Sequence, residues 1–336
     1  MTKRLWRVSA SGVGAVLTAA CIAHGAAAEP LTLRYGQDWS SAHSIYSLPI
    51  SVAQREGLFA REGLNVQVVI PVPGGSDKMI FDGLNKGWID VTHIATPFLI
   101  RAVMKGSDAV AIATEFKNAI YSLVARPNIK SYAGLKEKRI GLADEQGSIT
   151  IAMRKLLAKH GLPRGSFNVK TEEGTPQRFY CLLHSDCDAT VLGQPQDLQA
   201  LAQGYSLLGR SDEVVPDYLY TVTAVRRPWA ETHREAMVRY VRAMADAFAF
   251  IRSPDNRSKV VADIAATIGC SDAIAAQTLD LFSEPGRNVL PKSGEIDLKG
   301  LQQVIAMMAE AGLLRPPLPQ AERFVDMQYL QAAGVQ

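Results

Sequence analysis

The sequence predicts an α/β protein of two lobes, in which each lobe is a mainly parallel sheet flanked by helices. Short apolar runs of strand length alternate with segments of helical period over residues 31–116, and the alternation starts again at residue 139. Two extended runs, Tyr121–Arg126 and Tyr218–Val225, lie on either side of the second series. We interpret these runs as paired crossovers that form a two-strand hinge over a cleft.

The first series begins with the alternating strand LTLRYG at Leu31–Gly36, and a loop is expected at residues 37–43. A helix follows at residues 45–56, and Gly57 ends it. Three strands then alternate with two helices, namely strands Leu64–Ile70, Trp88–Ile94 and Ala109–Phe116 and helices Asp77–Lys86 and Phe98–Lys105. This order favours a parallel sheet with helices on both faces.

The second series opens with a strand at Arg139–Ala143, a turn, and a helix that Gly161 ends. Its apolar side chains recur at i, i+3, i+4, i+7 and i+8, the spacing of one helix face: Ile149, Ala152, Met153, Leu156 and Leu157. We place Ser148 at the N-cap, where its hydroxyl accepts a bond from a free N–H group. Strands at 168–171 and 189–192 and helices near 176–183 and 196–203 complete this series.

Each series contains a Gly-Ser turn directly before a helix, at Gly75-Ser76 and at Gly147-Ser148. The first N–H groups of a helix have no partner within it and carry a partial positive charge, so they suit an anionic or accepting ligand group. A single such turn is more often a plain cap. Two of them in opposite lobes favour a ligand site between the lobes.

Helical segments after the second crossover are expected to complete the first lobe, which makes the second lobe an insertion. They lie near residues 233–251, 258–268, 271–281 and 298–311. The expected organisation is therefore a signal peptide at 1–28, lobe one at 29–120 plus 225–336, and lobe two at 121–224.

The first 28 residues have the features of a secretory signal: a basic start, an apolar run at Val8–Ile22, and three alanines that end at Ala28. Without them the chain carries 33 basic and 33 acidic residues, a balance that gives no reason to expect nucleic-acid binding. We expect cleavage near Ala28 and a periplasmic protein. A lipoprotein anchored at Cys21 is less favoured, because Thr18 stands where a larger apolar residue is usual.

Three cysteines lie beyond the signal. Cys181 and Cys187 are close enough in sequence for a disulfide, which an exported protein permits. With His184 between them they also have a spacing compatible with metal binding, although no fourth ligand is evident. The sequence leaves the disulfide open and disfavours the metal. Cys270 is expected to be a small buried apolar residue.

The segment Gly57–Leu64, GLFAREGL, resembles a segment of periplasmic solute-binding proteins that serve ABC importers of the nitrate, sulfonate, taurine and pyrimidine-precursor group. The resemblance covers nearly all of the chain after the signal, and it continues through Thr96-Pro97, Ile129–Leu135, Arg139–Gly141, Gly147-Ser148, Asp188-Ala189, Phe324–Asp326 and Tyr329-Leu330. It implies the periplasmic binding protein type II fold and a non-catalytic protein without cofactor or metal. It also implies a permease partner, and we expect a monomer.

By this resemblance, ligand contacts come from loops that face the cleft. The candidates are Gln37, Asp38, Trp39 and His43 after the first strand, Gly75 and Ser76, Thr96, then Ser148, Ile149 and Thr150, and finally Gln194 and Gln196. Trp39 either stacks on a ligand or anchors its loop, and His43 is more often a surface or capping residue. From the residues themselves we add Glu115, which either pairs with a ligand amine or is a solvated acid at a strand end.

Lys78 is the only cation we expect in these loops, which argues against a bare inorganic anion. The expected ligand is a sulfonate, a carboxylate or a heteroaromatic molecule. An exported enzyme on the same fold is the competing function, but the sequence has no G-x-S-x-G, HExxH or P-loop motif.

Overall fold

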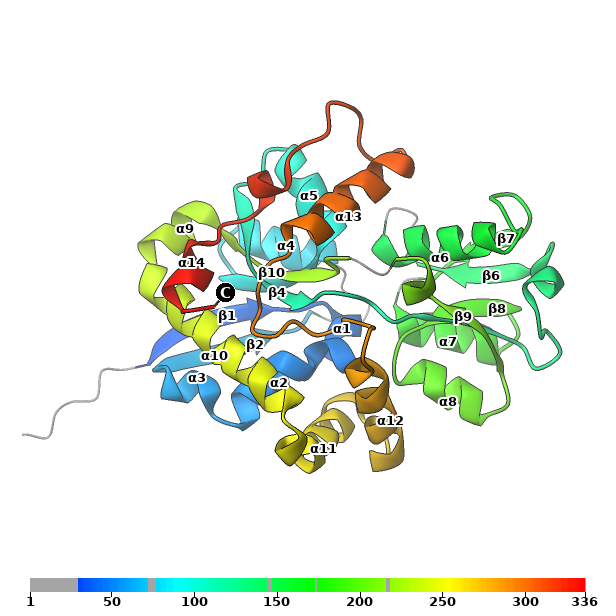
Figure 1. The fold of residues 1–336 in the computed structure, drawn as a ribbon, viewed down its shortest axis with the longest axis horizontal. Coiled ribbons are helices and arrows are strands. Elements are labelled where there is room, and N and C mark those ends of the chain that lie inside the picture. Colours follow the sequence, from blue (N-terminus) through cyan, green and yellow to red (C-terminus); the bar gives the residue numbers. More distant parts are fainter. Residues whose placement is uncertain (1–29, 72–76, 144–146, 173, 216–217, 336) are drawn as a thin grey trace, which may run out of the picture.

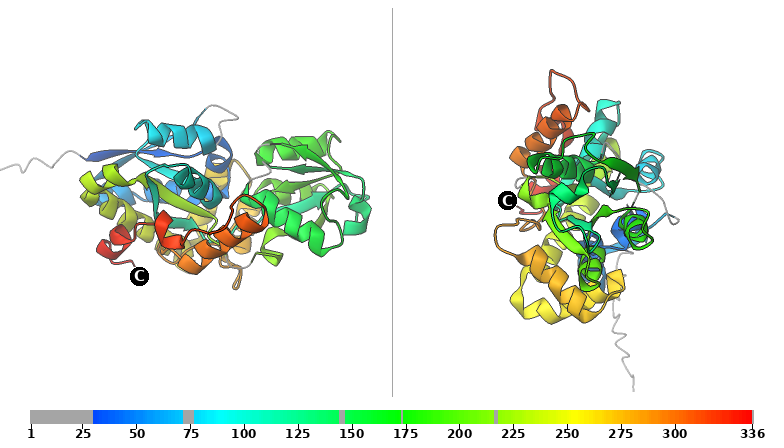
Figure 2. Two further views of the ribbon diagram at one scale, coloured as in Figure 1. Left: turned by 90° about the horizontal axis from the view of Figure 1, so that it is seen from above. Right: turned by 90° about the vertical axis from the view of Figure 1, so that its right-hand side faces the viewer.

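The computed structural model describes residues 30–71, 77–143, 147–172, 174–215 and 218–335. Two five-stranded sheets lie side by side in two lobes, with strand orders β2-β1-β3-β10-β4 and β7-β6-β8-β5-β9 (Figures 1 and 2). In each sheet four strands are parallel and one is antiparallel. The predicted mainly parallel sheets are therefore confirmed. The predicted signal peptide lies outside the described residues.

The first sheet consists of β1 (Leu31–Gly36), β2 (Leu64–Val69), β3 (Val91–Ala95), β4 (Ala109–Phe116) and β10 (Thr221–Arg226). Strand β10 is the antiparallel member and lies between β3 and β4. Strand β4 is the last strand of this sheet, yet every one of its residues is buried. The segment before the C-terminus pairs at Val325 with Ala111 of β4.

Helices from both ends of the chain surround this sheet: α1 (Trp39–Ala42), α2 (Leu48–Arg55), α3 (Leu58–Arg61), α4 (Asp77–Asn85), α5 (Thr96–Met104), α9 (Arg227–Thr232), α10 (Arg234–Arg252), α11 (Arg257–Ile268), α12 (Asp272–Ser283), α13 (Leu298–Glu310) and α14 (Gln328–Ala332). Helix α10 packs on α2, α3 and α14, and α13 packs on α5. Helices from the C-terminal part of the chain thus pack around the first sheet (Figure 1).

The second sheet consists of β5 (Ser122–Ala125), β6 (Arg139–Leu142), β7 (Asn168–Thr171), β8 (Ala189–Leu192) and β9 (Ser206–Arg210). Its helices are α6 (Ser148–Lys159), α7 (Thr175–Leu183) and α8 (Gln196–Ala202). Helix α8 lies beside α12 of the first lobe, and Lys155 of α6 forms an ion pair of 2.6 Å with Glu310 of α13. These contacts join the lobes outside the hinge.

The two extended runs expected as crossovers each contribute a strand to one sheet, β5 to the second and β10 to the first. The chain passes between lobes in the residues just before these strands. Hydrogen bonds hold the two passages together, from Tyr220 N to Phe116 O at 3.1 Å and from Ser211 N to Tyr121 O at 2.9 Å. Within the described ranges, these two adjacent passages are the backbone connections between the lobes.

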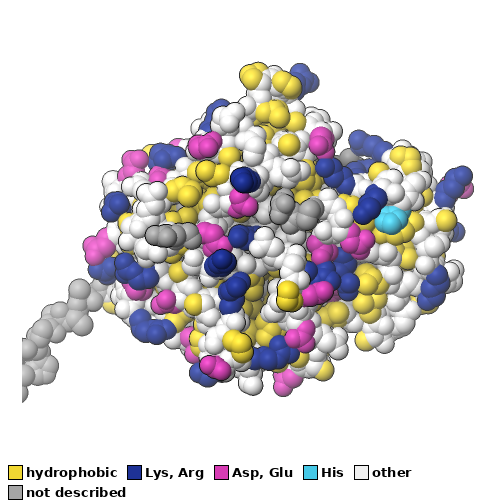
Figure 3. Space-filling model, in the orientation of Figure 1, with side chains coloured by type: hydrophobic (Ala, Val, Ile, Leu, Met, Phe, Trp, Pro, Cys, Tyr) yellow, Lys and Arg dark blue, Asp and Glu magenta, His cyan; other side chains and the backbone are white. Residues whose placement is uncertain are grey.

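Charged side chains of both signs are interspersed over the face in Figure 3, in keeping with the near balance of acids and bases. Within the described residues no single helix has the length and apolar composition of a membrane span; α11 with its preceding turn meets that criterion only together with α12, at a bend of 111°.

Candidate functional site

A cavity of about 380 Å³ lies between the two lobes. From the first lobe it is lined by α1 and the residue before it, by the start of α4, and by the junction of β3 with α5. From the second lobe it is lined by Ala143 after β6 and by the N-terminal ends of α6 and α7. Strand ends and helix starts therefore meet here from both lobes, where open α/β sheets commonly bind ligands.

The residues after β1 form a short helix, α1, where a loop was expected, because Asp38 caps it. The Asp38 Oδ1 accepts bonds from the N–H groups of Ser40 and Ser41 at 2.9 and 3.1 Å. Asp38 and Trp39 line the cavity. His43 lies behind Trp39, with ring centroids 4.0 Å apart, and its Nδ1 is 2.8 Å from the Trp39 carbonyl. His43 therefore supports Trp39 from outside the cavity.

Gln37 is fully buried beneath this loop. Its amide donates to Tyr46 O at 3.1 Å and accepts from Ser47 Oγ at 3.2 Å. Gln37 therefore holds the loop in place and does not line the cavity.

The β3–α5 junction reaches the cavity through Ala95, Pro97 and Phe98. Thr96 lies between them but turns inward: its side chain is 1 % exposed, and its hydroxyl has no hydrogen-bond partner among the described residues. Thr96 N donates to Tyr220 O at 3.0 Å, which fixes this junction to the hinge.

The N-terminal end of α6 lines the cavity with Gly147, Ser148 and Ile149. Gly147 is the N-cap and Ser148 the first helical residue, so the expected N-cap position of Ser148 is off by one. Thr150 points into lobe two, where its buried hydroxyl has no partner among the described residues. The other predicted turn, Gly75-Ser76, lies outside the described residues, and its neighbours Asp77 and Lys78 line the cavity.

Gln194 and Gln196 do not line the cavity. The Gln194 amide donates to Asp197 Oδ2 at 2.8 Å, and Ser122 Oγ donates to the same oxygen at 2.7 Å. Burial raises the pKa of Asp197, and these hydrogen bonds oppose that rise. This cluster links α8 to β5 inside the second lobe.

Glu115 is buried beneath the cavity floor, with 1 % of its surface exposed, so it is not a solvated acid. It accepts bonds from Tyr35 at 3.0 and 3.2 Å, from Thr223 at 2.8 Å and from His93 Nδ1 at 2.8 Å. His93 itself lines the cavity. Burial alone would lower the pKa of His93, but the adjacent Glu115 carboxylate outweighs burial and raises it.

Two arginines that the sequence analysis did not place here also line the cavity, Arg101 of α5 and Arg178 of α7. The Arg101 guanidinium lies 5.4 Å from the centre of the Phe98 ring. The sequence interpretation considered only the turn residues before each helix. Arg178 lies one turn inside α7, after Gly174 and Thr175, so that interpretation did not include it. Lys78 was the only cation expected in the loops named from the sequence, and the cavity adds two cations from the helices α5 and α7.

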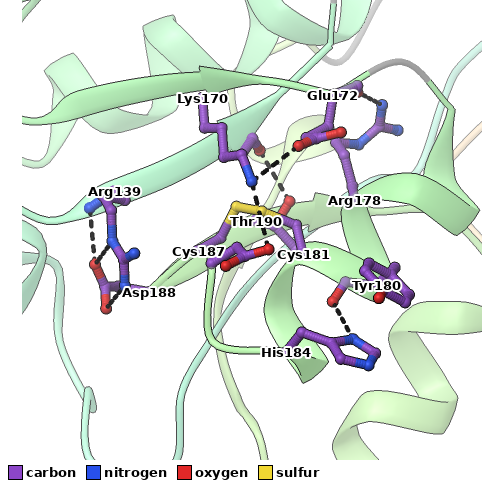
Figure 4. The surroundings of a disulfide bond; sticks show 12 residues. Arg139, Lys170, Glu172, Arg178, Tyr180, Cys181, His184, Cys187, Asp188 and Thr190 are labelled. Atoms are coloured by element: carbon purple, nitrogen blue, oxygen red, sulfur yellow. Dashed lines mark hydrogen bonds and ion pairs between the residues drawn. A yellow bond between two sulfur atoms is a disulfide. The ribbon is translucent and has the colours of Figure 1, made fainter.

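Arg178 is 2 % exposed, and backbone carbonyls hold it from two sides. It donates through Nε to Val191 O at 2.6 Å and through Nη2 to Thr175 Oγ1 at 3.1 Å. Its Nη1 donates to Glu172 O at 3.1 Å (Figure 4). Burial lowers the pKa of Arg178, yet an arginine stays charged at neutral pH. Within the described residues no carboxylate is hydrogen-bonded to this guanidinium.

Residues 44–266 match the model of the NMT1-like family, which is more than half of the chain. This chain belongs to the NMT1-like family. No curated protein sequence matches it.

Three solved structures show how widely this NMT1-like fold is shared. The first is the ligand-binding component of an ABC-type import system from Staphylococcus aureus, with zinc bound; identity is 15%, coverage is 90% of this chain and 99% of that one, and the TM-score is 0.72. The second is the periplasmic aliphatic sulphonate-binding protein SsuA from Escherichia coli, with 20% identity, coverage of 89% and 92%, and a TM-score of 0.68. The third is the desulfurization enzyme DSZB, with 16% identity, coverage of 90% and 98%, and a TM-score of 0.67.

These likenesses confirm the predicted two-lobe fold of periplasmic binding proteins. Two of the three are binding proteins and one is an enzyme, so the fold alone does not fix the function of the NMT1-like chain.

A disulfide joins Cys181 to Cys187, which decides between the two interpretations of these cysteines (Figure 4). Both sulfurs are engaged, and the His184 ring stacks on Tyr180 at 3.7 Å, so the metal interpretation is wrong. The bond ties the C-terminal end of α7, the helix that carries Arg178, to the segment before β8. Cys270 is partly exposed, not fully buried as expected. The described part of this NMT1-like chain holds no cluster of His, Cys, Asp or Glu suited to a metal ion.

Proposed function

We propose that this chain is the solute-binding protein of an ABC importer and that it captures a small organic anion between its lobes. The S. aureus import component and SsuA, which share its fold, support a binding role. A cavity of about 380 Å³ is in the size range of small-molecule sites. The observation that carries the proposal is the buried charge of Arg178.

A buried charge is costly unless an opposite charge accompanies it. Three bonds to neutral oxygens satisfy part of Arg178 and leave one N–H group on each terminal nitrogen. An arginine presents such a pair of N–H groups in a fixed plane that matches a carboxylate or sulfonate. A ligand anion would therefore supply the missing counter-charge, with Ser148 and the nearby N-terminal end of α6 offering further donors.

The ligand can contact both lobes at once only in the closed form, so it makes more contacts there than in the open form. A ligand shifts a conformational equilibrium only by its difference in affinity for the two states. Trp39 and Phe98 line the cavity from lobe one, and Arg178 and Ile149 line it from lobe two. A ligand bound to both sets favours the closed form, which the permease would then recognise.

The remaining parts of the proposal concern organisation and location. Lobe one comprises residues 29–120 with 225–336, and lobe two comprises residues 121–224. The chain is exported to the periplasm, loses its signal near Ala28, works as a monomer without a cofactor, and delivers its ligand to membrane permease subunits.

Calorimetric titration of the mature chain tests the ligand class, with ethanesulfonate, benzenesulfonate, propionate, nitrate and uracil as probes. We expect an organic anion to bind. Charge-assisted hydrogen bonds contribute about 1.5–3 kcal/mol, so Arg178→Gln should weaken that affinity by roughly 10- to 150-fold.

The matched control is Arg126→Gln. Arg126 also donates to backbone carbonyls of lobe two, those of Cys187 and Ser185, but it does not line the cavity. Urea unfolding of both variants separates a loss of binding from a loss of folding. Equal affinity in Arg178→Gln and wild type, or binding of uracil alone, contradicts an anion site.

An enzyme on the same fold is the alternative, favoured by the likeness to DSZB. Prolonged incubation of the mature chain with each bound probe, followed by mass spectrometry, separates the two functions. A binding protein returns the probe unchanged, whereas any product would replace the proposal by the enzyme.

A further inference from the structure

We propose that His93 is a polar ligand contact of lobe one, donating a hydrogen bond through Nε2, so that the ligand carries a second acceptor group besides the anion held by Arg178. This inference rests on the proposed function and narrows its ligand class. It also adds a polar contact from lobe one to that of Arg178 from lobe two, which increases the preference of the ligand for the closed form.

The first step concerns the proton shared by His93 and Glu115. Their contact, from Nδ1 to Oε2, measures 2.8 Å, and the carboxylate also receives hydroxyl bonds from Tyr35 and Thr223. A carboxylate accepts hydrogen bonds and does not donate them. The proton in the His93–Glu115 contact therefore lies on Nδ1, which fixes the orientation of the imidazole.

The second step concerns the other ring nitrogen. His93 belongs to β3 and is 2 % exposed, yet it lines the cavity. Within the described residues Nε2 has no hydrogen-bond partner, in contrast to Nδ1. A polar atom at the edge of a largely buried site needs a partner, and here the cavity is the space in which that partner can sit.

The third step concerns charge. Burial opposes the protonated form of His93, but Glu115 favours it more strongly, and Asp38 and Asp77 add to that effect, so the pKa is raised. Lys78 and Arg101 line the same lobe-one wall of the cavity, and Tyr240 stacks behind Tyr35 at 6.5 Å. With the proton on Nδ1 fixed, protonation makes Nε2 a donor. A ligand acceptor is therefore held best below the pKa of His93 and less well above it.

The test compares two probes that differ in one group: ethanesulfonate has one anionic group, and sulfoacetate adds a carboxylate acceptor. Their dissociation constants are measured by calorimetry between pH 5.5 and 9 with the mature wild-type chain. A charge-assisted bond predicts that sulfoacetate binds at least about tenfold tighter at low pH. That advantage should shrink as the pH rises through the pKa of His93.

Three variants locate the effect. His93→Asn keeps an amide donor for Glu115 but removes Nε2, so it should abolish the advantage of sulfoacetate. Glu115→Gln removes the charge that favours the imidazolium, so the pH at which the advantage disappears should move down. His233→Asn is the matched control, because His233 is exposed and stacks on Trp229 away from the cavity.

The possible results distinguish the inference from the function beneath it. If both probes bind and neither pH nor His93→Asn changes their ratio, His93 is not a ligand contact, while the anion site at Arg178 stands. If neither probe binds the wild-type chain at any pH, the proposed anion site fails and the inference fails with it. Nitrogen-15 NMR of the unliganded chain gives an independent check, since a ring protonated only on Nε2 also overturns the inference.

Discussion

At the scale of single residues, Arg178 and His93 have the same physical design on opposite sides of the cavity. Each is almost fully buried, and neighbouring oxygens engage part of its donor capacity. Side chains held in this way lose little freedom when a ligand arrives, so more of the contact energy appears as affinity. The two side chains differ in how they respond to pH. Arginine is charged throughout the physiological range, whereas histidine can gain or lose its charge within that range.

The Glu115–His93 pair should also make stability depend on pH. The pKa of His93 is raised in the folded state. Protonated His93 therefore stabilises the fold fully at a pH below the pKa of a histidine in the unfolded chain, about 6.5. This contribution is lost as the pH rises through the folded pKa. In urea unfolding at pH 6–9, the wild type should lose free energy of unfolding where Glu115→Gln does not. Parallel pH profiles of the two proteins would contradict this coupling.

Single residues were also where sequence reasoning was least reliable. Asp38, Trp39, Ser148 and Ile149, which the sequence suggested as ligand contacts, line the cavity. Thr96 and Thr150 do not, because consecutive positions at the start of a helix point in different directions, and only a structure shows which one faces the opening. The sequence could not place Arg178 at all, since its relation to the cavity depends on how α7 packs against β8.

At the scale of elements, the N-terminal end of α6 allows a direct test of whether a helix start contacts the ligand. Ser148 is the first helical residue, a position that tolerates proline because its N–H has no helical partner. Gly147 before it has φ −79° and ψ 148°, which suits the residue preceding a proline. Ser148→Pro therefore removes a hydroxyl and an N–H from the cavity with little strain on the helix.

We expect Ser148→Pro to weaken ethanesulfonate binding several-fold, as the loss of about 1 kcal/mol from a hydrogen bond implies. Its urea midpoint should be no lower than that of Ser148→Ala, which also removes the hydroxyl that contacts the buried Tyr218. Ser148→Ala, which keeps the N–H group, should give a smaller loss of affinity. Unchanged affinity in the proline variant would show that the α6 start is only structural.

At the scale of the whole molecule, the order of strands and helices was enough to predict two α/β lobes, since short apolar strands alternating with helices have few stable arrangements. The position of the crossing was harder to predict. Both extended runs contribute strands to the sheets, and the crossing lies in the residues just before them. Strand-like sequence does not distinguish a strand inside a sheet from a passage between sheets.

Two adjacent connections and a shared cavity suggest a molecule that closes on its ligand. Some side contacts between the lobes are partly exposed, such as the Lys155–Glu310 pair, and exposed ion pairs contribute little to stability. A ligand that bridges the lobes could therefore decide their relative position.

Small-angle X-ray scattering of the mature chain, recorded without and with saturating ethanesulfonate, tests this closure most directly. We predict a smaller radius of gyration in the presence of the anion, and no such change for Arg178→Gln at the same concentration. An unchanged radius for a wild-type chain that calorimetry shows to be fully occupied would contradict capture between closing lobes.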